Sequence, residues 1–343
     1  MSLPPSEIPQ GAIRFNTDSQ KLEFYAQGEW WVMASDTPNL GRGADTTAGT
    51  RGVYMGGTTG TLTDAIDYFN LSSPGNGQDF GNLTSARYAM SGCSSSTRGL
   101  AMGGSENPTI VNKIDMIEFA STANATDFGD LAVTTWYSSG LSNATRGINA
   151  GGYVPAAPTV SNQINYVTIA SNGVNGQDFG NLVGSFTSMG VAASPVRGVF
   201  GGGYAPGSSN DTIQYITIAS LGDAQDFGDL SEGKSNMGGL SNATRGLFFG
   251  GESPKTARIE YIQIASLGNG TKFGDMQGEA NLPTGCASST RGIMMGFERN
   301  SPTGRVNVID MVTIATFGDA VDFGDLSSAR STGACCSNAH GGL

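Results

Sequence analysis

A repeat of about 48 residues constrains the fold of this chain more than any other feature of its sequence. An Arg-Gly pair recurs at intervals of 46 to 51 residues, and a degenerate His-Gly copy stands near the C-terminus. The pairs begin at Arg51, Arg98, Arg146, Arg197, Arg245 and Arg291, and the last copy begins at His340. A regular period of this length is typical of an array of similar supersecondary units.

Each unit contains four short segments with the character of β-strands. An apolar run follows Arg-Gly and stops at a glycine pair such as Gly56-Gly57, except in the sixth unit, where Gly296-Phe297 takes that place. An isoleucine-rich segment (AIDYFNL in the first unit), a DFGDL-like segment and a stretch of small residues follow. Short apolar runs bounded by glycine predict strands. With 52 glycines among 343 residues to supply tight turns, we expect an all-β fold.

The order of these segments resembles the kelch repeat, with phenylalanine where kelch repeats usually carry tryptophan. The resemblance covers residues 38–343 and implies a six-bladed kelch-like β-propeller with four strands per blade. We expect the small-residue segment at residues 327–339 to complete the first blade and close the ring. Seven blades, with outer strands taken from residues 13–33, are the alternative.

Length variation is concentrated in the loop that follows the glycine pair. From Arg to the next isoleucine-rich segment the count varies from 14 to 18 residues, whereas the other intervals are nearly constant. Variable loops on a rigid scaffold commonly carry recognition, although they can also be tolerated insertions. The expected recognition residues are the aromatic, proline and polar residues of the longer loops, namely Tyr153, Pro155, Pro158, Tyr204, Pro206, Phe297, Arg299 and Asn300.

The residues that could carry chemistry favour a structural interpretation. Because an Arg stands in every unit, we expect each one to pair with a carboxylate or carbonyl of the repeat, such as the acidic group of DFGD. Repeated Asp pairs such as Asp127 and Asp130 could bind Ca²⁺, but turn capping explains them equally well. The single histidine, His340, removes a His-based triad. We therefore expect no enzyme, no metal and no cofactor.

Four cysteines are too few and too scattered for a disulfide framework. Cys93, Cys286 and Cys335 each stand five residues before Arg or His. We therefore assign these three to one repeat position and expect small buried apolar side chains there.

The charge balance limits the class of partner. The 18 basic and 29 acidic residues give a formal net charge of −11, which argues against nucleic-acid binding. The sequence lacks the long apolar run of a membrane-spanning helix, and its first ten residues lack the features of a secretory signal. We expect neither nucleic-acid binding nor membrane insertion.

The N-terminal segment differs from the repeats. Residues 11–33 alternate apolar and polar side chains around two turns, which predicts a three-stranded meander too small to be stable alone. The pattern GxIRFNTDS…KLEFY…GxW resembles a short β-module of tailed-bacteriophage fibres and appendages. This resemblance implies a virion protein, made in the host cytoplasm, in which residues 1–37 mount the chain on other virion proteins. It also implies a homo-oligomer, such fibres being frequently trimeric.

Together the two resemblances imply a tail fibre or appendage component whose propeller, residues 38–343, recognises the host surface without catalysis. The expected receptor is a cell-surface glycan, notably a polysaccharide, or a protein. The first alternative is a purely structural virion component, such as a collar or capsid decoration. The second is an intracellular kelch-type adaptor, and the third is a glycan-cleaving enzyme.

Overall fold

β-Strands build both units of the chain. The computed structural model describes residues 8–9, 11–16, 21–32, 49–155, 159–253, 255–300 and 303–339. Two compact units, residues 1–43 and 44–343, divide the chain; the expected boundary between residues 37 and 38 lies outside the described residues. Within the described ranges every regular element is a strand, and no helix is long and apolar enough to span a membrane. The predicted all-β character is confirmed.

The N-terminal unit contains a three-stranded antiparallel meander. Its strands pair in the order β1 (Ile13–Asn16), β2 (Lys21–Ala26) and β3 (Glu29–Val32). On one side Arg14 forms an ion pair with Glu23 at 2.8 Å and lies 4.1 Å above the Trp30 ring. Ile13 and Phe15, which alternate with Arg14 along β1, are 61% and 60% exposed. One face of this small sheet is therefore apolar and uncovered.

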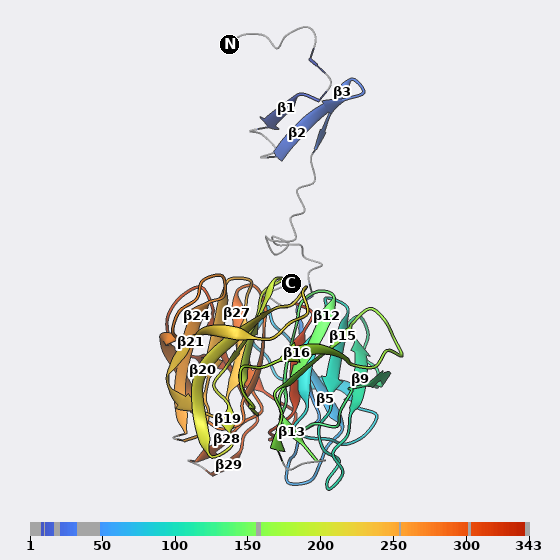
Figure 1. Cartoon of the computed structure of the whole chain (residues 1–343). Helices are drawn as coiled ribbons and strands as arrows, with labels where there is room; N and C mark the ends of the chain where they lie inside the picture. The colour runs from blue at the N-terminus through green and yellow to red at the C-terminus, as the bar shows by residue number, and fades with distance from the viewer. Residues whose placement is uncertain are drawn as a thin grey trace. The chain divides into compact units, whose positions relative to one another are not determined.

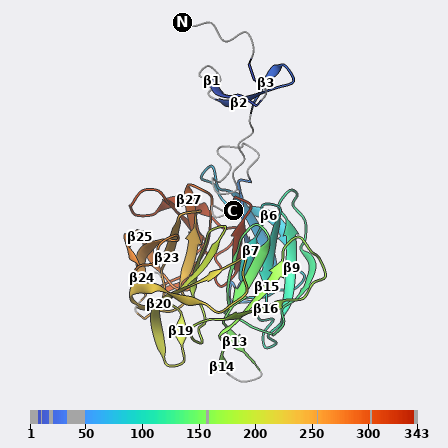
Figure 2. The same cartoon turned by 45° about the horizontal axis from the view of Figure 1, so that its top comes forward.

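The larger unit repeats an antiparallel sheet built on four strands, one sheet having a short fifth strand, β19 (Tyr204–Ala205). In all but one sheet the four repeated strands pair in chain order (Figures 1 and 2). The small-residue segments form β7 (Ser91–Ser94), β11 (Ser139–Ser142), β17 (Gly190–Ala193), β22 (Gly238–Ser241), β26 (Thr284–Ala287) and β32 (Ala334–Ser337). The Arg-Gly segments form β4 (Arg51–Met55), β8 (Arg98–Met102), β12 (Arg146–Ala150), β18 (Arg197–Gly201), β23 (Arg245–Phe249) and β27 (Arg291–Met295).

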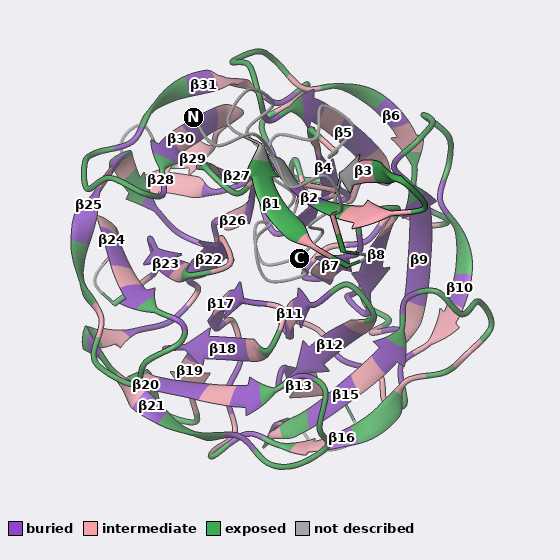
Figure 3. Ribbon diagram, turned by 90° about the horizontal axis from the view of Figure 1, so that it is seen from above, coloured by how far each residue is buried: buried purple, intermediate pink, exposed green. Residues whose placement is uncertain are grey.

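The other two strands of each sheet lie farther out. The isoleucine-rich segments form β5 (Ala65–Asn70), β9 (Lys113–Glu118), β15 (Gln163–Thr168), β20 (Ser208–Thr217), β24 (Thr256–Gln263) and β30 (Val308–Thr313). The DFG segments form β6 (Gln78–Asn82), β10 (Thr126–Asp130), β16 (Gln177–Asn181), β21 (Gln225–Lys234), β25 (Thr271–Ala280) and β31 (Val321–Asp325). Seen from above in Figure 3, β7, β11, β17, β22 and β26 surround the centre and the DFG strands form the rim. This arrangement is consistent with a β-propeller-like fold.

The sheet out of chain order joins the two ends of the larger unit. Strand β32, from the C-terminal end, pairs with β4, and Cys336 lies opposite Val53. Cys93 lies opposite Leu100, the corresponding residue of its own sheet. The equivalent of Cys93 is therefore Cys336, and the assignment of Cys335 to that position was wrong. The error arose because Arg51, rather than His340, supplies the Arg of this sheet.

Apolar side chains fill the spaces between neighbouring sheets. Each main cluster combines residues of two sheets; one, for example, contains Phe69 from β5 together with Ile293 and Phe323 from the last repeat. The Phe69 and Phe323 ring centroids lie 6.3 Å apart in an edge-to-face contact. Burial of each such ring contributes about 1.5–3 kcal/mol, so the packing between sheets stabilises their arrangement.

The repeated arginines also link neighbouring sheets. The Arg146 guanidinium donates to the carbonyl of Ile218 in the next repeat at 2.8 Å and lies 4.8 Å above the Tyr166 ring of its own sheet. The equivalent bond from Arg291 reaches back to the carbonyl of Leu71 at 3.0 Å. A carbonyl partner was among the expectations, whereas the suggested DFGD carboxylate is not the acceptor in these bonds. The arginines therefore hold sheets together.

The DFG glycine lies in a β-bulge within the strand. The pairing of β30 with β31 shifts register at this point, and Gly324 has a φ of 150°. A Cβ atom there would collide with the carbonyl oxygen of Gly75 in the first repeat. Glycine is required because the backbones of two sheets approach closely at the bulge.

Candidate functional site

The loops that follow the glycine pairs lie at one end of the larger unit, the lower end in Figure 1; we call this end the loop face. Three of these loops contain short hairpin strands of their own. These are β13 (Tyr153–Val154) with β14 (Thr159–Val160), β19 (Tyr204–Ala205) with the start of β20, and β28 (Glu298–Asn300) with β29 (Thr303–Arg305). The expected recognition residues all belong to these three loops.

The first two hairpins present their expected residues at the surface. Tyr153 is partly exposed and forms a bridge with Trp136, and Pro155 is exposed. Tyr204 is also partly exposed, and its hydroxyl accepts a hydrogen bond from the Gly207 amide at 3.2 Å next to the exposed Pro206. Pro158 lies outside the described residues.

The third hairpin corrects the expectation for Phe297. This side chain is 0% exposed and belongs to an apolar cluster between two sheets, because it replaces the second glycine of the pair and packs inward. Arg299 lies with its guanidinium carbon 5.3 Å from the Phe297 ring centroid. Asn300 pairs with Thr303 beside the hairpin turn.

Arg299 lies near a buried carboxyl, that of Asp310 on β30, which is 0% exposed. Burial raises the pKa of Asp310, while a hydrogen bond from the Gln277 amide and the charge of Arg299 lower it, with a net upward shift. Three other repeats place a buried cation, Arg87, Lys234 or Arg330, beside the equivalent acid. The fifth repeat has Ala280 at that position. Arg299 therefore partly supplies the missing positive charge.

Replacing Asp310 with Asn should stabilise the protein at pH 7. Because the folded pKa is raised, the native carboxyl favours folding when protonated, and this contribution is lost as the pH rises from 3.8 through the folded value. We expect D310N to gain on the order of 1 kcal/mol in free energy of unfolding at pH 7 and less at pH 4. Urea unfolding at both pH values measures this.

The same change at Asp67 is the matched control. This carboxylate lies 2.8 Å from the buried guanidinium of Arg330, so D67N should destabilise the protein at pH 7. A loss of stability in D310N as large as that in D67N would contradict the assigned cost of burying Asp310.

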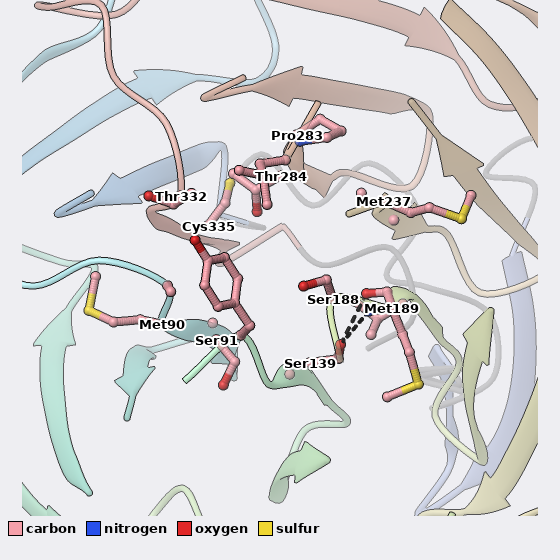
Figure 4. A pocket seen from close by; sticks show the side chains of 18 of the residues that line it. Met90, Ser91, Ser139, Ser188, Met189, Met237, Pro283, Thr284, Thr332 and Cys335 are labelled. Atoms are coloured by element: carbon pink, nitrogen blue, oxygen red, sulfur yellow. Dashed lines mark hydrogen bonds between the residues drawn. The ribbon is translucent and has the colours of Figure 1, made fainter. Parts of the chain in front are cut away.

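An axial pocket opens among the beginnings of the inner strands. Its volume is about 120 Å³, and it is lined by three or four residues from around the start of each of β7, β11, β17, β22, β26 and β32. Figure 4 shows Ser139, Ser188, Thr284 and Thr332 around it, and Ser139 both donates to the Met189 carbonyl at 3.0 Å and accepts from its amide at 3.1 Å. All six sheets therefore contribute to one cavity.

Six equivalent residues at this pocket have left-handed backbones with φ between 53° and 60°. We call them the left-handed ring: Ala89, Tyr137, Ser188, Asn236, Leu282 and Thr332. Backbone hydrogen bonds connect four of the successive pairs, as from the Ala89 amide to the Thr332 carbonyl (2.7 Å) and from the Tyr137 amide to the Ala89 carbonyl (2.9 Å). These bonds hold the strained residues in place.

Four partly exposed aromatic rings gather beside one side of the pocket. Trp136 lies with its ring centroid 5.0 Å from that of Tyr137, 5.8 Å from that of Tyr88 and 6.0 Å from that of Tyr153. We call these four residues the aromatic cluster. Of its members Tyr137 also lines the pocket, so the cluster and the cavity form one continuous surface.

The described lining of this pocket contains no charged or histidine side chain. Burial, followed by the neighbouring Tyr88, raises the pKa of Tyr137 to about 12, so its hydroxyl stays protonated at physiological pH. No group of three or more His, Cys, Asp or Glu suited to a metal occurs in the part of the chain that the structure describes. The site can offer apolar faces and neutral hydrogen-bonding groups.

Loop lengths alone did not identify this site. Of the expected residues only Tyr153 belongs to the aromatic cluster, whereas Tyr88, Trp136 and Tyr137 come from the segment before the inner strand. Residue type varies at the repeat position nine residues before Arg-Gly, where Ala89, Tyr137, Ser188, Asn236 and Leu282 stand, and Tyr88 and Trp136 stand one position earlier. Residue type also varies at the buried position of Arg87 and Ala280, so the variation becomes informative only once the structure places these residues at the pocket.

No family model matches the chain, and no curated protein matches it. The geometry of the loop face therefore has to carry the functional argument.

Proposed function

We propose that residues 44–343 form a closed, six-bladed propeller of the kelch-like kind. Three contacts between the first and last repeats support closure: the pairing of β32 with β4, the bond from Arg291 to Leu71, and the packing of Phe69 on Phe323. The seven-blade alternative has no such support, since β1, β2 and β3 pair only with one another among the described strands.

We propose that the protein is a bacteriophage virion component, a tail fibre or appendage, that binds a host-surface polysaccharide without cleaving it. The observation that carries this proposal is the aromatic cluster beside an uncharged pocket. Flat aromatic rings with polar edges suit the apolar faces and hydroxyl groups of sugars. Hydrolysis of a glycosidic bond uses two carboxyl groups, and the described lining of the pocket offers none.

The N-terminal unit would serve as the mounting module. Its sequence resembles phage appendage segments, and the uncovered Ile13 and Phe15 provide an apolar face for other virion proteins or further copies of the chain. Several copies on one particle would add avidity to weak individual contacts. In this proposal the protein is made in the host cytoplasm and resides in the virion.

Binding of fluorescently labelled full-length protein to a panel of intact bacterial cells tests the proposal. We expect saturable binding to a few strains, competed by their own surface polysaccharide. No binding to any strain by folded protein would instead favour the structural virion role, and release of soluble sugar fragments from the cells would favour the enzyme.

A matched variant tests the contribution of the loop face to this binding. The hairpin β19–β20 turns through Pro206-Gly207, so residues 155–158 can be replaced by Pro-Gly to give β13–β14 the same short turn. We expect cell binding to fall about tenfold, which corresponds to about 1.4 kcal/mol, with an unchanged melting temperature. Undiminished binding would remove this hairpin from the recognition surface.

A further inference from the structure

The left-handed ring keeps side chains where glycine would remove backbone strain. A left-handed conformation is unfavourable for a residue that carries a Cβ atom. The same protein places glycine at other left-handed positions nearby, such as Gly103 and Gly104, yet none of the six ring members is glycine. Strained backbone conformations cluster at ligand-binding and active sites. The ring side chains are therefore candidates for ligand contact.

The chemistry of the ring is mixed and neutral. Tyr137 and Leu282 supply apolar surface, Ser188 supplies a hydroxyl group, and Thr332 supplies a hydroxyl oxygen that can accept, since the Thr332 hydroxyl donates to the Ser331 carbonyl. The Asn236 amide nitrogen donates to the Glu252 carboxylate at 2.8 Å. A wall that combines apolar surface with a few neutral polar groups suits a small-molecule pocket. The cavity of about 120 Å³ is close to the roughly 150 Å³ of a cavity that holds one benzene-sized ring. One six-membered ring is thus the appropriate size of occupant.

We infer that the axial pocket binds one uncharged pyranose ring, the terminal residue of a neutral polysaccharide; this specificity rests on the proposed function. The apolar face of the sugar would lie against Tyr137, its hydroxyl groups would bond to Ser188 and Thr332, and the adjoining sugar would stack on Trp136. The left-handed ring thus offers an apolar face and neutral hydrogen-bonding groups to the sugar, and none of its members is charged.

An acidic sugar fits this site poorly. Burying a carboxylate without a cationic partner costs several kcal/mol, and the described lining of the pocket supplies no cation. The net charge of −11 additionally disfavours the approach of a polyanionic chain. A peptide is also disfavoured, because the pocket is a compact axial cavity rather than the sheet edge or extended groove that peptides use.

Saturation-transfer NMR of the full-length protein with a panel of methyl pyranosides tests the inference. The panel contains neutral glucoside, galactoside, mannoside, rhamnoside and N-acetylglucosaminide together with glucuronide and N-acetylneuraminide. We expect a saturable signal from at least one neutral sugar and none from the acidic ones. Equal or stronger signals from an acidic sugar would overturn the inference.

Two variants that borrow residues from the other repeats locate the site. Y137A copies Ala89 at the equivalent left-handed position and removes the ring wall, and S188Y copies Tyr137 and fills the cavity. Both should reduce the neutral-sugar signal at least tenfold, whereas F317A, at the opposite end of the sheets, should leave it unchanged. An unaltered signal in both pocket variants would overturn the inference, and melting curves establish that each variant is folded.

The two proposals can fail separately. Saturable cell binding without any sugar signal overturns the pocket inference and leaves host recognition standing, as does cell binding that protease treatment of the cells abolishes. A neutral-sugar signal that depends on Tyr137 and Ser188 supports the pocket inference even when no strain in the cell panel is bound.

Discussion

Replacing Arg87 with Ala should lower the free energy of unfolding by about 3–5 kcal/mol, the cost of leaving one buried charge without its partner. The Arg87 guanidinium lies 2.9 Å from the Asp115 carboxylate, and the two side chains are 0% and 2% exposed. The same guanidinium donates to the carbonyls of Gly103 and Lys113, so these acceptors also lose a partner. Urea unfolding and the melting temperature measure the loss.

The next repeat shows which pair of residues should restore the stability that is lost when Arg87 is replaced. At the positions of Arg87 and Asp115, the next repeat has the neutral residues Thr135 and Asn165, which are 1% and 5% exposed. The double variant R87T/D115N copies that neutral pair and should recover most of the stability, because no unpaired charge remains buried. R87T alone should stay as unstable as R87A.

A double variant no more stable than R87T would contradict this explanation. It would mean that the hydrogen bonds of Arg87, rather than the unpaired Asp115, account for the loss. The unfolding of a large repeat unit can proceed in steps, so agreement between fluorescence and circular dichroism transitions is part of the measurement.

The repeating architecture could be predicted because it depends on local sequence. Glycine-bounded apolar runs define strands wherever they occur, and six similar copies make the pattern unmistakable. The inward position of Phe297 could not be predicted in the same way, because it depends on space left between two sheets. The role of Arg299 likewise depends on Asp310 from another strand and on the absence of a cation at Ala280.

The alignment of the last repeat with the other repeats also could not be predicted from the sequence. Counting from His340 assigned Cys335 to the position that Cys336 occupies, because the sheet is completed by Arg51 from the other end of the unit. Spacing along the chain cannot reveal a register that is set between distant segments. The left-handed ring could not be predicted from the sequence for a similar reason, since its members approach one another only when all six inner strands come together.

Replacing Trp136 with Ser should reduce the affinity for host cells by roughly 30-fold, or about 2 kcal/mol, as expected for a tryptophan at the centre of a binding surface. Trp136 contacts three other rings of the aromatic cluster, so its removal opens the middle of the proposed stacking surface. Multivalent attachment enlarges the effect on whole cells. Titration of labelled protein against cells of a bound strain measures it.

The choice of serine keeps this test separate from folding. Ser235 occupies the equivalent position in another repeat and forms the same backbone bridge, to Glu252, that Trp136 forms to Tyr153. The W136S variant should therefore melt close to the unmodified protein. F317A removes a ring that is 56% exposed in the connection at the opposite end of β30, and it should bind cells normally.

Comparison of W136S with Y137A separates the two parts of the surface. If Trp136 stacks the second sugar while Tyr137 holds the first, both variants lose polysaccharide binding, but only Y137A loses the monosaccharide. The effects of the two substitutions on the free energy of polysaccharide binding should also be non-additive, because the two rings are in contact and share one ligand. Normal cell binding by W136S together with a loss in F317A would place recognition at the opposite end of the sheets and refute the aromatic cluster as the receptor site.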